Sequence, residues 1–198
     1  MQARRATCAR CLRAQSACIC QWITPLASSV ELLILQHPLE VGNAKNSARL
    51  LHLSVQPSVM VVGETFDAGA LAGLLEEGGR TPVLLYPDTP GVVSLPLDVT
   101  EPGTLRLVIV DATWRKSRKM LYLNPLLQSL PRLTLRAMPT SHYRIRKAHA
   151  PDQLSTLEAA AYALMQVDAA PARWQGLIAA FDGFVGQQMG FVPDAPLE

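Results

Sequence analysis

The sequence has no cysteine outside residues 8–20, no acidic residue between Asp111 and Asp152, and no apolar run as long as a membrane span. It has neither a Gly-x-Gly-x-x-Gly fingerprint nor a Walker-type phosphate loop, which argues against a classical dinucleotide or triphosphate site. The N-terminus lacks the apolar core of a secretory signal. We therefore expect a cytoplasmic protein that does not bind membranes.

The four cysteines are confined to one short segment. They are Cys8, Cys11, Cys18 and Cys20. Four thiolates make a complete tetrahedral ligand set for Zn²⁺, and a closed set of this kind is structural rather than catalytic. Cytosolic thiols stay reduced, which favours a metal over disulfides. We expect residues 1–28 to be a zinc-binding segment whose folding depends on the metal. A redox cluster and two disulfides are the alternatives.

The rest of the chain alternates between strand and helix patterns. Strands are expected at residues 30–36, 58–62, 82–86, 105–110 and 132–137, and helices at residues 43–55, 67–77, 113–128, 155–167 and 172–189. This alternation predicts an α/β fold, with a mostly parallel sheet that is covered by helices on both faces. A length of 198 residues suits one domain with a small appendage. We assign residues 29–192 to the main domain and residues 193–198 to a tail.

The chain places polar residues where strands are expected to end. Asp111 follows the apolar strand 105–110, and Trp114 lies on the cationic helix expected directly after it. Open α/β sheets bind ligands at the carboxyl ends of their strands. Other candidates at or just past strand ends are Gln36, His37, Gly63, Tyr86 and Pro87. The alternatives are an ordinary strand–helix turn with a solvated helix, and a hydrogen-bonded loop role for His37.

Positive charge is concentrated in two segments without acidic residues. The first contains Arg115, Lys116, Arg118, Lys119, Arg132, Arg136, Arg144, Arg146 and Lys147. The second contains Arg4, Arg5, Arg10 and Arg13. If the two segments meet in space, they form one basic face of the kind that binds nucleic acid. The alternative is two separate solvated surfaces. Residues 139–147 mix aromatic, hydroxyl and cationic side chains, a combination that suits looped RNA, and a mobile surface loop is the alternative.

Ser155 and Glu158 have the spacing of a helix capping box, which alone explains both residues. The same helix start can also face the carboxylate of an anionic ligand through its backbone amides. The two interpretations are compatible.

Several short motifs occur together in one order along nearly the whole chain. They are the four-cysteine segment, residues 35–40 (LQHPLE), 84–87 (LLYP), 111–120 (DATWRKSRKM) and 154–159 (LSTLEA). In this combination the chain resembles the DTW-domain family of tRNA-uridine aminocarboxypropyltransferases. One departure is Ala112, where family members often have Gly or no inserted residue, and alanine still permits the turn.

The resemblance implies an activity and a fold. Members use S-adenosylmethionine but transfer its 3-amino-3-carboxypropyl group, releasing methylthioadenosine. The acceptor in bacterial members is N3 of a uridine in the variable loop of tRNA. The implied fold is similar to that of SPOUT-type methyltransferases, with a trefoil knot. The expected partners are tRNA and S-adenosylmethionine, and no DNA is expected.

The resemblance also suggests roles for individual residues. Asp111 is the candidate general base that removes the N3 proton, and Glu158 is its rival. Expected contacts to S-adenosylmethionine are Gln36, His37, Gly63, Tyr86, Pro87, Ala112, Thr113, Trp114, Ser155 and Thr156. Expected contacts to tRNA phosphates are Arg115, Lys116, Arg118, Lys119, Arg144, Arg146 and Lys147. Two alternatives remain: an RNA methyltransferase of SPOUT type, and a zinc-containing RNA-binding module without catalysis.

Overall fold

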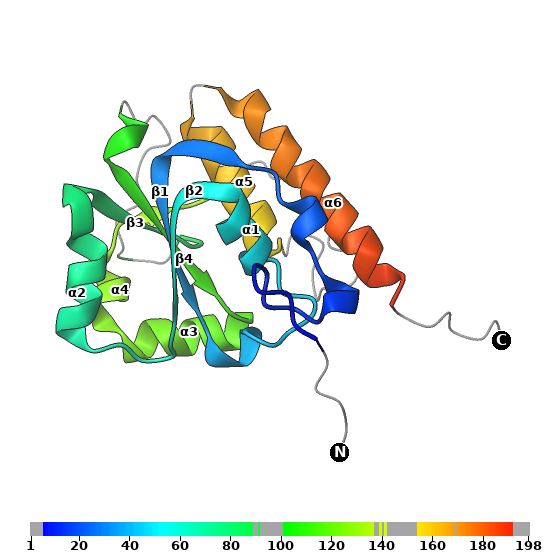
Figure 1. The fold of residues 1–198 in the computed structure, drawn as a ribbon. Coiled ribbons are helices and arrows are strands. Elements are labelled where there is room, and N and C mark those ends of the chain that lie inside the picture. Colours follow the sequence, from blue (N-terminus) through cyan, green and yellow to red (C-terminus); the bar gives the residue numbers. More distant parts are fainter. Residues whose placement is uncertain are drawn as a thin grey trace, which may run out of the picture.

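A sheet of five strands, all paired in parallel, forms the centre of the protein (Figure 1). The computed structural model describes residues 6–88, 91, 101–136, 139, 141, 154–168 and 170–191. The strands are β1 (Leu26–Gln36), β2 (Val55–Val62), β3 (Thr81–Leu85), β4 (Leu105–Asp111) and β5 (Arg132–Leu133). Their order across the sheet is β2-β1-β4-β3-β5. The prediction of an α/β fold with a parallel sheet is confirmed.

Helices cover both faces of this sheet. They are α1 (Ala48–Ser54), α2 (Ala68–Glu76), α3 (Trp114–Leu123), α4 (Pro125–Ser129), α5 (Thr156–Val167) and α6 (Gln175–Met189). Short 3₁₀ turns are η1 (Gln15–Ala17), η2 (Cys20–Trp22), η3 (Pro38–Glu40), η4 (Glu77–Gly79), η5 (Pro102–Thr104) and η6 (Pro171–Trp174). Among the described helices, none is both long enough and apolar enough to cross a membrane.

The alternation of side chains along β1 divides the apolar residues into two cores. Leu32 and Ile34 pack with residues of α1, α5 and α6. Leu33 and Leu35 point to the opposite face and pack with residues of α2, α3 and α4. Because successive side chains of a strand point to opposite faces, an unbroken apolar run in a parallel strand requires cover on both sides. Because the strands are parallel, their carboxyl ends, including the paired Gln36 and Asp111, lie at one edge of the sheet.

Several predicted boundaries differ from the structure; for example, β1 and β2 begin earlier than expected, at Leu26 and Val55. The helix expected over residues 43–55 begins only at Ala48, because the side-chain oxygen of Asn46 accepts a hydrogen bond from the Ala48 amide at 3.0 Å. The helix expected over residues 113–128 divides into α3 and α4, with Asn124 in a non-helical conformation before Pro125. The strand expected at residues 132–137 has only two residues.

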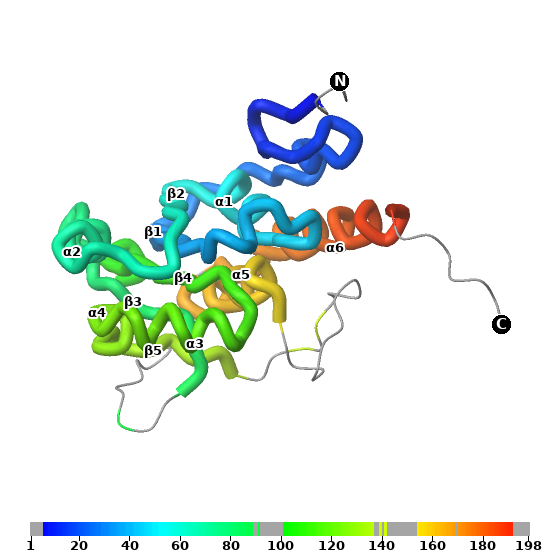
Figure 2. Tube along the Cα trace, turned by 90° about the horizontal axis from the view of Figure 1, so that it is seen from below, coloured from blue at the N-terminus to red at the C-terminus, as the bar shows by residue number. Residues whose placement is uncertain are grey.

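The N-terminal segment packs along α6 (Figure 2). Trp22 donates from Nε1 to Oε1 of Gln187 at 2.5 Å, and Nε2 of Gln187 donates to the Cys18 carbonyl at 3.0 Å. Ile19 and Cys11 are buried in the same apolar core as α6. The cysteine-rich segment therefore shares its packing with the main domain. The expected trefoil knot stays a prediction, since residues 142–153, between β5 and α5, lie outside the described part of the chain.

Candidate functional site

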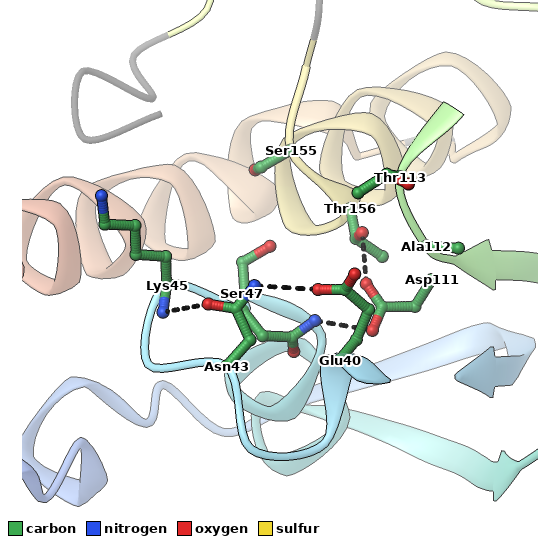
Figure 3. A pocket seen from close by; sticks show the side chains of 10 residues that line it. Glu40, Asn43, Lys45, Ser47, Asp111, Ala112, Thr113, Ser155 and Thr156 are labelled. Atoms are coloured by element: carbon green, nitrogen blue, oxygen red, sulfur yellow. Dashed lines mark hydrogen bonds between the residues drawn. The ribbon is translucent and has the colours of Figure 1, made fainter. Parts of the chain in front are cut away.

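Asp111, the last residue of β4, is at the centre of a buried polar network. It pairs in register with Gln36, the last residue of β1. Oδ2 of Asp111 accepts hydrogen bonds from Nε2 of Gln36 at 2.9 Å and from Nδ2 of Asn46 at 2.7 Å. Oδ1 accepts one from the Thr156 hydroxyl at 2.7 Å (Figure 3). A single carboxyl group thus connects two strands, the segment before α1 and the start of α5.

The environment of Asp111 changes its acidity. Only 2% of the residue is exposed, and this burial raises the pKa of its carboxyl above the ordinary aspartate value. The hydrogen bonds from Thr156, Gln36 and Asn46 act in the opposite direction, while the negative charge of Glu40 raises the pKa further. A carboxylate with a raised pKa is a stronger proton acceptor than an ordinary one. The network therefore suits a general base.

A polar pocket opens beside Asp111. Its lining is Glu40, Asn43, Lys45, Asn46, Ser47, Asp111, Ala112, Thr113, Ser155 and Thr156 (Figure 3). Five of these residues are predicted site residues: Asp111, Ala112, Thr113, Ser155 and Thr156. The other five belong to residues 40–47, part of which the sequence pattern predicts to be helical. The signal for them is the Asn- and Ser-rich composition of residues 43–47, which is typical of turns and caps.

Side-chain hydrogen bonds fix the segment 40–47 in place. Nδ2 of Asn43 donates to Oε2 of Glu40 at 2.9 Å, and the Asn43 side-chain oxygen accepts from the Lys45 amide at 3.0 Å. The Ser47 hydroxyl oxygen accepts from the Leu157 amide in the first turn of α5 at 3.2 Å. These bonds replace the helical ladder that the segment lacks. Half of the pocket wall is therefore built by a loop that its own side chains order.

The capping box at the start of α5 is confirmed. The Ser155 hydroxyl oxygen accepts from the Glu158 amide at 3.2 Å, and Oε2 of Glu158 accepts from the Ser155 amide at 2.7 Å. Glu158 has no exposed surface, also accepts from the Ser141 hydroxyl, and does not line the pocket. The backbone amides of Ser155, Leu157 and Glu158 each donate a hydrogen bond. Among residues 155–158 of the described structure, this leaves the Thr156 amide without a hydrogen-bond partner.

An aromatic pair lies just past the carboxyl ends of β3 and β4. The rings of Tyr86 and Trp114 meet edge to face with centroids 5.8 Å apart, and the Tyr86 hydroxyl contacts the Ser117 hydroxyl at 3.2 Å. Trp114 is 42% exposed. The guanidinium of Arg132 lies 5.3 Å from the Tyr86 ring centroid, and this residue is buried. Arg132 is therefore not part of an exposed basic face. Neither aromatic ring lines the polar pocket, and neither does Pro87.

His37 and Gly63 support the site from outside the pocket. Nδ1 of His37 accepts from the Leu39 amide at 3.1 Å, and Nε2 lies 3.1 Å from Oε1 of Glu64. The amide of Gly63 donates to the Gln36 carbonyl at 3.0 Å. A Cβ at Gly63 would lie 2.6 Å from the Phe66 ring, so the close approach requires glycine. His37 thus has the contacts of a hydrogen-bonded loop residue.

Helix α3 carries the cations expected to contact tRNA. Nζ of Lys116 pairs with Oε1 of Glu40 at 3.0 Å, and Nζ of Lys119 pairs with Oε2 of Glu64 at 2.9 Å. The bond from Lys119 is the largest cause that lowers the pKa of Glu64. Arg115 and Arg118 are exposed and form no ion pair within the described residues. Arg144, Arg146 and Lys147 lie outside the described residues.

The four cysteines converge on one point. Their sulfur atoms all lie within 4.8 Å of one another, with Cys8 and Cys20 3.6 Å apart and Cys11 and Cys18 3.8 Å apart. A tetrahedron with Zn–S bonds of about 2.3 Å has sulfurs roughly 3.8 Å apart, whereas a disulfide needs about 2.05 Å. No disulfide joins the four cysteines in the structure, and their spacing favours a shared metal over the disulfide alternative. Backbone hydrogen bonds at Cys11 and Arg10 lower the pKa of Cys8 to about 6, whereas burial raises the pKa of Cys20 to about 12. The donor set fits Zn²⁺.

The chain is similar in sequence to known proteins over most of its length. The DTW domain model matches residues 5–189. The chain is 32% identical over 183 residues to tRNA-uridine aminocarboxypropyltransferase 2 of Drosophila melanogaster, spanning 88% of this chain and 72% of that protein. It is 31% identical over 171 residues to tRNA-uridine aminocarboxypropyltransferase 2 of Mus musculus, spanning 81% of this chain and 56% of that protein. No solved structure matches it. The chain belongs to the DTW domain family.

Proposed function

We propose that this protein transfers the 3-amino-3-carboxypropyl group of S-adenosylmethionine to N3 of a uridine in tRNA. The observation that carries the proposal is the buried Asp111 carboxyl, oriented by three donors at the edge of a polar pocket. Membership of the DTW family and the names of the curated relatives support the same activity. We place the protein in the cytoplasm, on a SPOUT-like scaffold.

The proposed reaction needs a base and no acid. Uridine N3 carries an imide proton that must leave as the new N–C bond forms. S-adenosylmethionine supplies the electrophilic carbon beside its sulfonium, and its C–S bond breaks to leave neutral methylthioadenosine. Asp111 accepts the proton. Its Oδ1 accepts one hydrogen bond and its Oδ2 accepts two, so Oδ1 retains a lone pair for this step.

The structure favours Asp111 over Glu158 as the base. Glu158 is fully buried, and its carboxylate accepts hydrogen bonds from the Ser155 amide and the Ser141 hydroxyl. Using it as a base would disrupt the first turn of α5. Asp111 lines the pocket, and burial raises its pKa. We therefore assign proton removal to Asp111 and helix capping to Glu158.

The pocket fits the amino-acid end of the donor. Its lining contains one exposed cation, Lys45, two buried carboxyl groups, Glu40 and Asp111, and hydroxyl and amide groups, but no aromatic side chain. Lys45 and the Thr156 amide suit the carboxylate of the transferred group, and Glu40 suits its ammonium. The adenosine then extends toward Tyr86 and Trp114, where an exposed aromatic face is present. This orientation directs the aminocarboxypropyl chain, and not the methyl group, toward the base.

The tRNA would lie across the carboxyl edge of the sheet. The exposed cations of α3 are placed to contact phosphates, and Arg144, Arg146 and Lys147 extend this set in sequence. Zn²⁺ in the cysteine cluster is assigned a structural role because all four ligands come from the protein.

The position of a label in the donor tests the activity. Two preparations of S-adenosylmethionine, one labelled at the carboxyl carbon and one at the methyl, are incubated with the protein and unmodified tRNA. We expect the carboxyl label in RNA and the methyl label in methylthioadenosine. Methyl label in RNA would identify a methyltransferase. Binding of tRNA without transfer of either label would identify a binding module.

A further inference from the structure

Arg13 belongs to the cysteine segment, but its side chain contacts the pocket segment. Its guanidinium donates to the carbonyl oxygens of Ala44 and Asn46, the second at an Nη2–O distance of 2.5 Å. The same group lies over the Phe184 ring of α6, 5.1 Å from the centroid. A planar guanidinium fork can bridge two carbonyls at once, which a lysine ammonium cannot do with the same geometry.

The cysteine cluster fixes the backbone of Arg13. The Cys8 amide donates to the Arg13 carbonyl at 2.8 Å, and the Leu12 amide donates to the Cys8 carbonyl at 2.9 Å. A bridge between Thr7 and Ala14 closes the same turn. Cys11 is only two residues from Arg13. The turn from Cys8 to Arg13 therefore contains two of the four cysteines that would hold the metal. Because so short a segment has little core of its own, metal bound to the four sulfurs would stabilise this turn.

The carbonyls that Arg13 contacts belong to residues that build the site. The Asn46 side chain donates to Oδ2 of Asp111 at 2.7 Å, and the next residue, Ser47, accepts from the Leu157 amide at the start of α5. Both Asn46 and Ser47 are buried. A shift of the backbone at residues 44–46 therefore displaces a donor to the candidate base and a contact to α5.

We infer that Arg13 is a positioning residue through which the metal-loaded cysteine cluster stabilises the ligand-binding conformation of residues 43–47. The inference rests on the proposed function for the identity of the ligand, S-adenosylmethionine. It assigns the cysteine segment a role in shaping the donor pocket, in addition to any contact with tRNA.

The test compares three variants by donor binding and by hydrogen exchange, without tRNA. They are Arg13→Ala, Arg13→Lys and Arg10→Ala. Arg10 is the matched control, because it is an exposed cation of the same segment whose side chain has no hydrogen bond or ion pair in the described structure. We expect Arg13→Ala to raise the Kd for S-adenosylmethionine about tenfold or more, and to speed exchange at the amides of residues 43–48. Arg10→Ala should change neither. Wild-type binding and exchange in Arg13→Ala would overturn the inference.

Two further measurements, on Arg13→Lys and on zinc-depleted protein, separate a loss of folding from a loss of positioning. If Arg13→Ala loses zinc or unfolds, Arg13→Lys decides, since it keeps the charge and we expect weakened binding with wild-type zinc content. Wild-type binding and exchange in Arg13→Lys would then overturn the inference.

Removing zinc with a chelator should speed hydrogen exchange at the amides of residues 43–48 in the wild type, with little further change in Arg13→Ala. Additive effects of chelation and mutation would contradict the coupling. If the wild type does not bind S-adenosylmethionine, the proposed function fails. The hydrogen-exchange result still tests whether Arg13 couples the cysteine cluster to residues 43–47.

Discussion

Asn46 donates a hydrogen bond from Nδ2 to Oδ2 of Asp111 at 2.7 Å, joining two buried residues that lie 65 positions apart. The other end of the same amide accepts from the Ala48 amide at 3.0 Å, which sets the start of α1. One side chain therefore fixes both a helix boundary and the orientation of the candidate base. An aspartate in this position would face Asp111 with a second negative charge, so the neutral amide is the appropriate partner.

Asp111→Asn should separate catalysis from binding. The asparagine oxygen can accept from Gln36 and Asn46, and its amide can donate to the Thr156 hydroxyl, so the network keeps its hydrogen bonds. We expect the fold and the Kd for S-adenosylmethionine to be retained, and single-turnover transfer to fall roughly 10²- to 10⁴-fold. Wild-type turnover in this variant would remove Asp111 as the base.

The same variant has a predicted effect on the pH dependence of stability. Burial raises the pKa of Asp111 in the native state above the unfolded value of about 3.9. The native state then binds the proton more tightly, so this group reduces the free energy of unfolding as pH rises through its native pKa. The stability of Asp111→Asn relative to wild type should therefore increase with pH over that window. Urea unfolding from pH 4 to pH 8 measures it, and the opposite slope would contradict the assigned direction.

Two glycines of α6 should respond oppositely to alanine. A Cβ at Gly183 would lie 2.2 Å from the Trp22 ring, whereas a Cβ at Gly186 meets nothing within 4 Å. Gly183→Ala should displace Trp22 and lower the free energy of unfolding by about 1–3 kcal/mol. Gly186→Ala should raise it by about 0.5–1 kcal/mol through helix propensity. Thermal or urea unfolding of both variants provides the comparison. Equal effects would mean that the segment does not pack on α6 as described.

The strand and the helix that hold the site were predictable from local sequence patterns. The apolar run before Asp111 predicted a buried strand with a carboxylate at its end, and both features are present in β4. The spacing of Ser155 and Glu158 predicted the capping box that begins α5. These predictions succeed because their physical causes, burial on both faces and capping of free amides, act over a few residues.

The pocket wall was not predictable in the same way. The apolar spacing of residues 44–55 favours a helix, but the side-chain oxygens of Asn43 and Asn46 accept hydrogen bonds from backbone amides and hold residues 43–47 out of it. The contact between Asn46 and Asp111 depends on how β1 and β4 pair, and no local pattern contains that pairing. Likewise, Arg132 is part of a basic run in the sequence but is buried against Tyr86 in the fold.

Zinc should contribute to stability through the cysteine cluster. We expect one Zn²⁺ per chain by native mass spectrometry, and its loss in Cys11→Ser, whose buried sulfur lies 3.8 Å from that of Cys18. A chelator should lower the Tm of the wild type and have little effect on this variant. A metal-free wild type with an unchanged Tm would exclude the zinc assignment.

The exposed arginines of α3 should contribute to tRNA affinity through charge. Arg115→Gln and Arg118→Gln each remove a cation without an ion pair in the described structure, and each should reduce the slope of log Kd against log salt by about 1. Arg173→Gln is the control, because this residue pairs with Asp168 at 3.1 Å and hydrogen-bonds the Ala27 carbonyl at the opposite end of β1. A salt slope unchanged by both α3 variants would place the tRNA elsewhere.

The most direct test of the account is the mass of the modified nucleoside. The protein is incubated with S-adenosylmethionine and unmodified tRNA, and the tRNA is then digested to nucleosides for mass spectrometry, with Asp111→Asn in parallel. We expect a uridine heavier by one aminocarboxypropyl group in the wild type and little of it in the variant. A uridine heavier by one methyl group, or no modified uridine while the tRNA stays bound, would contradict it.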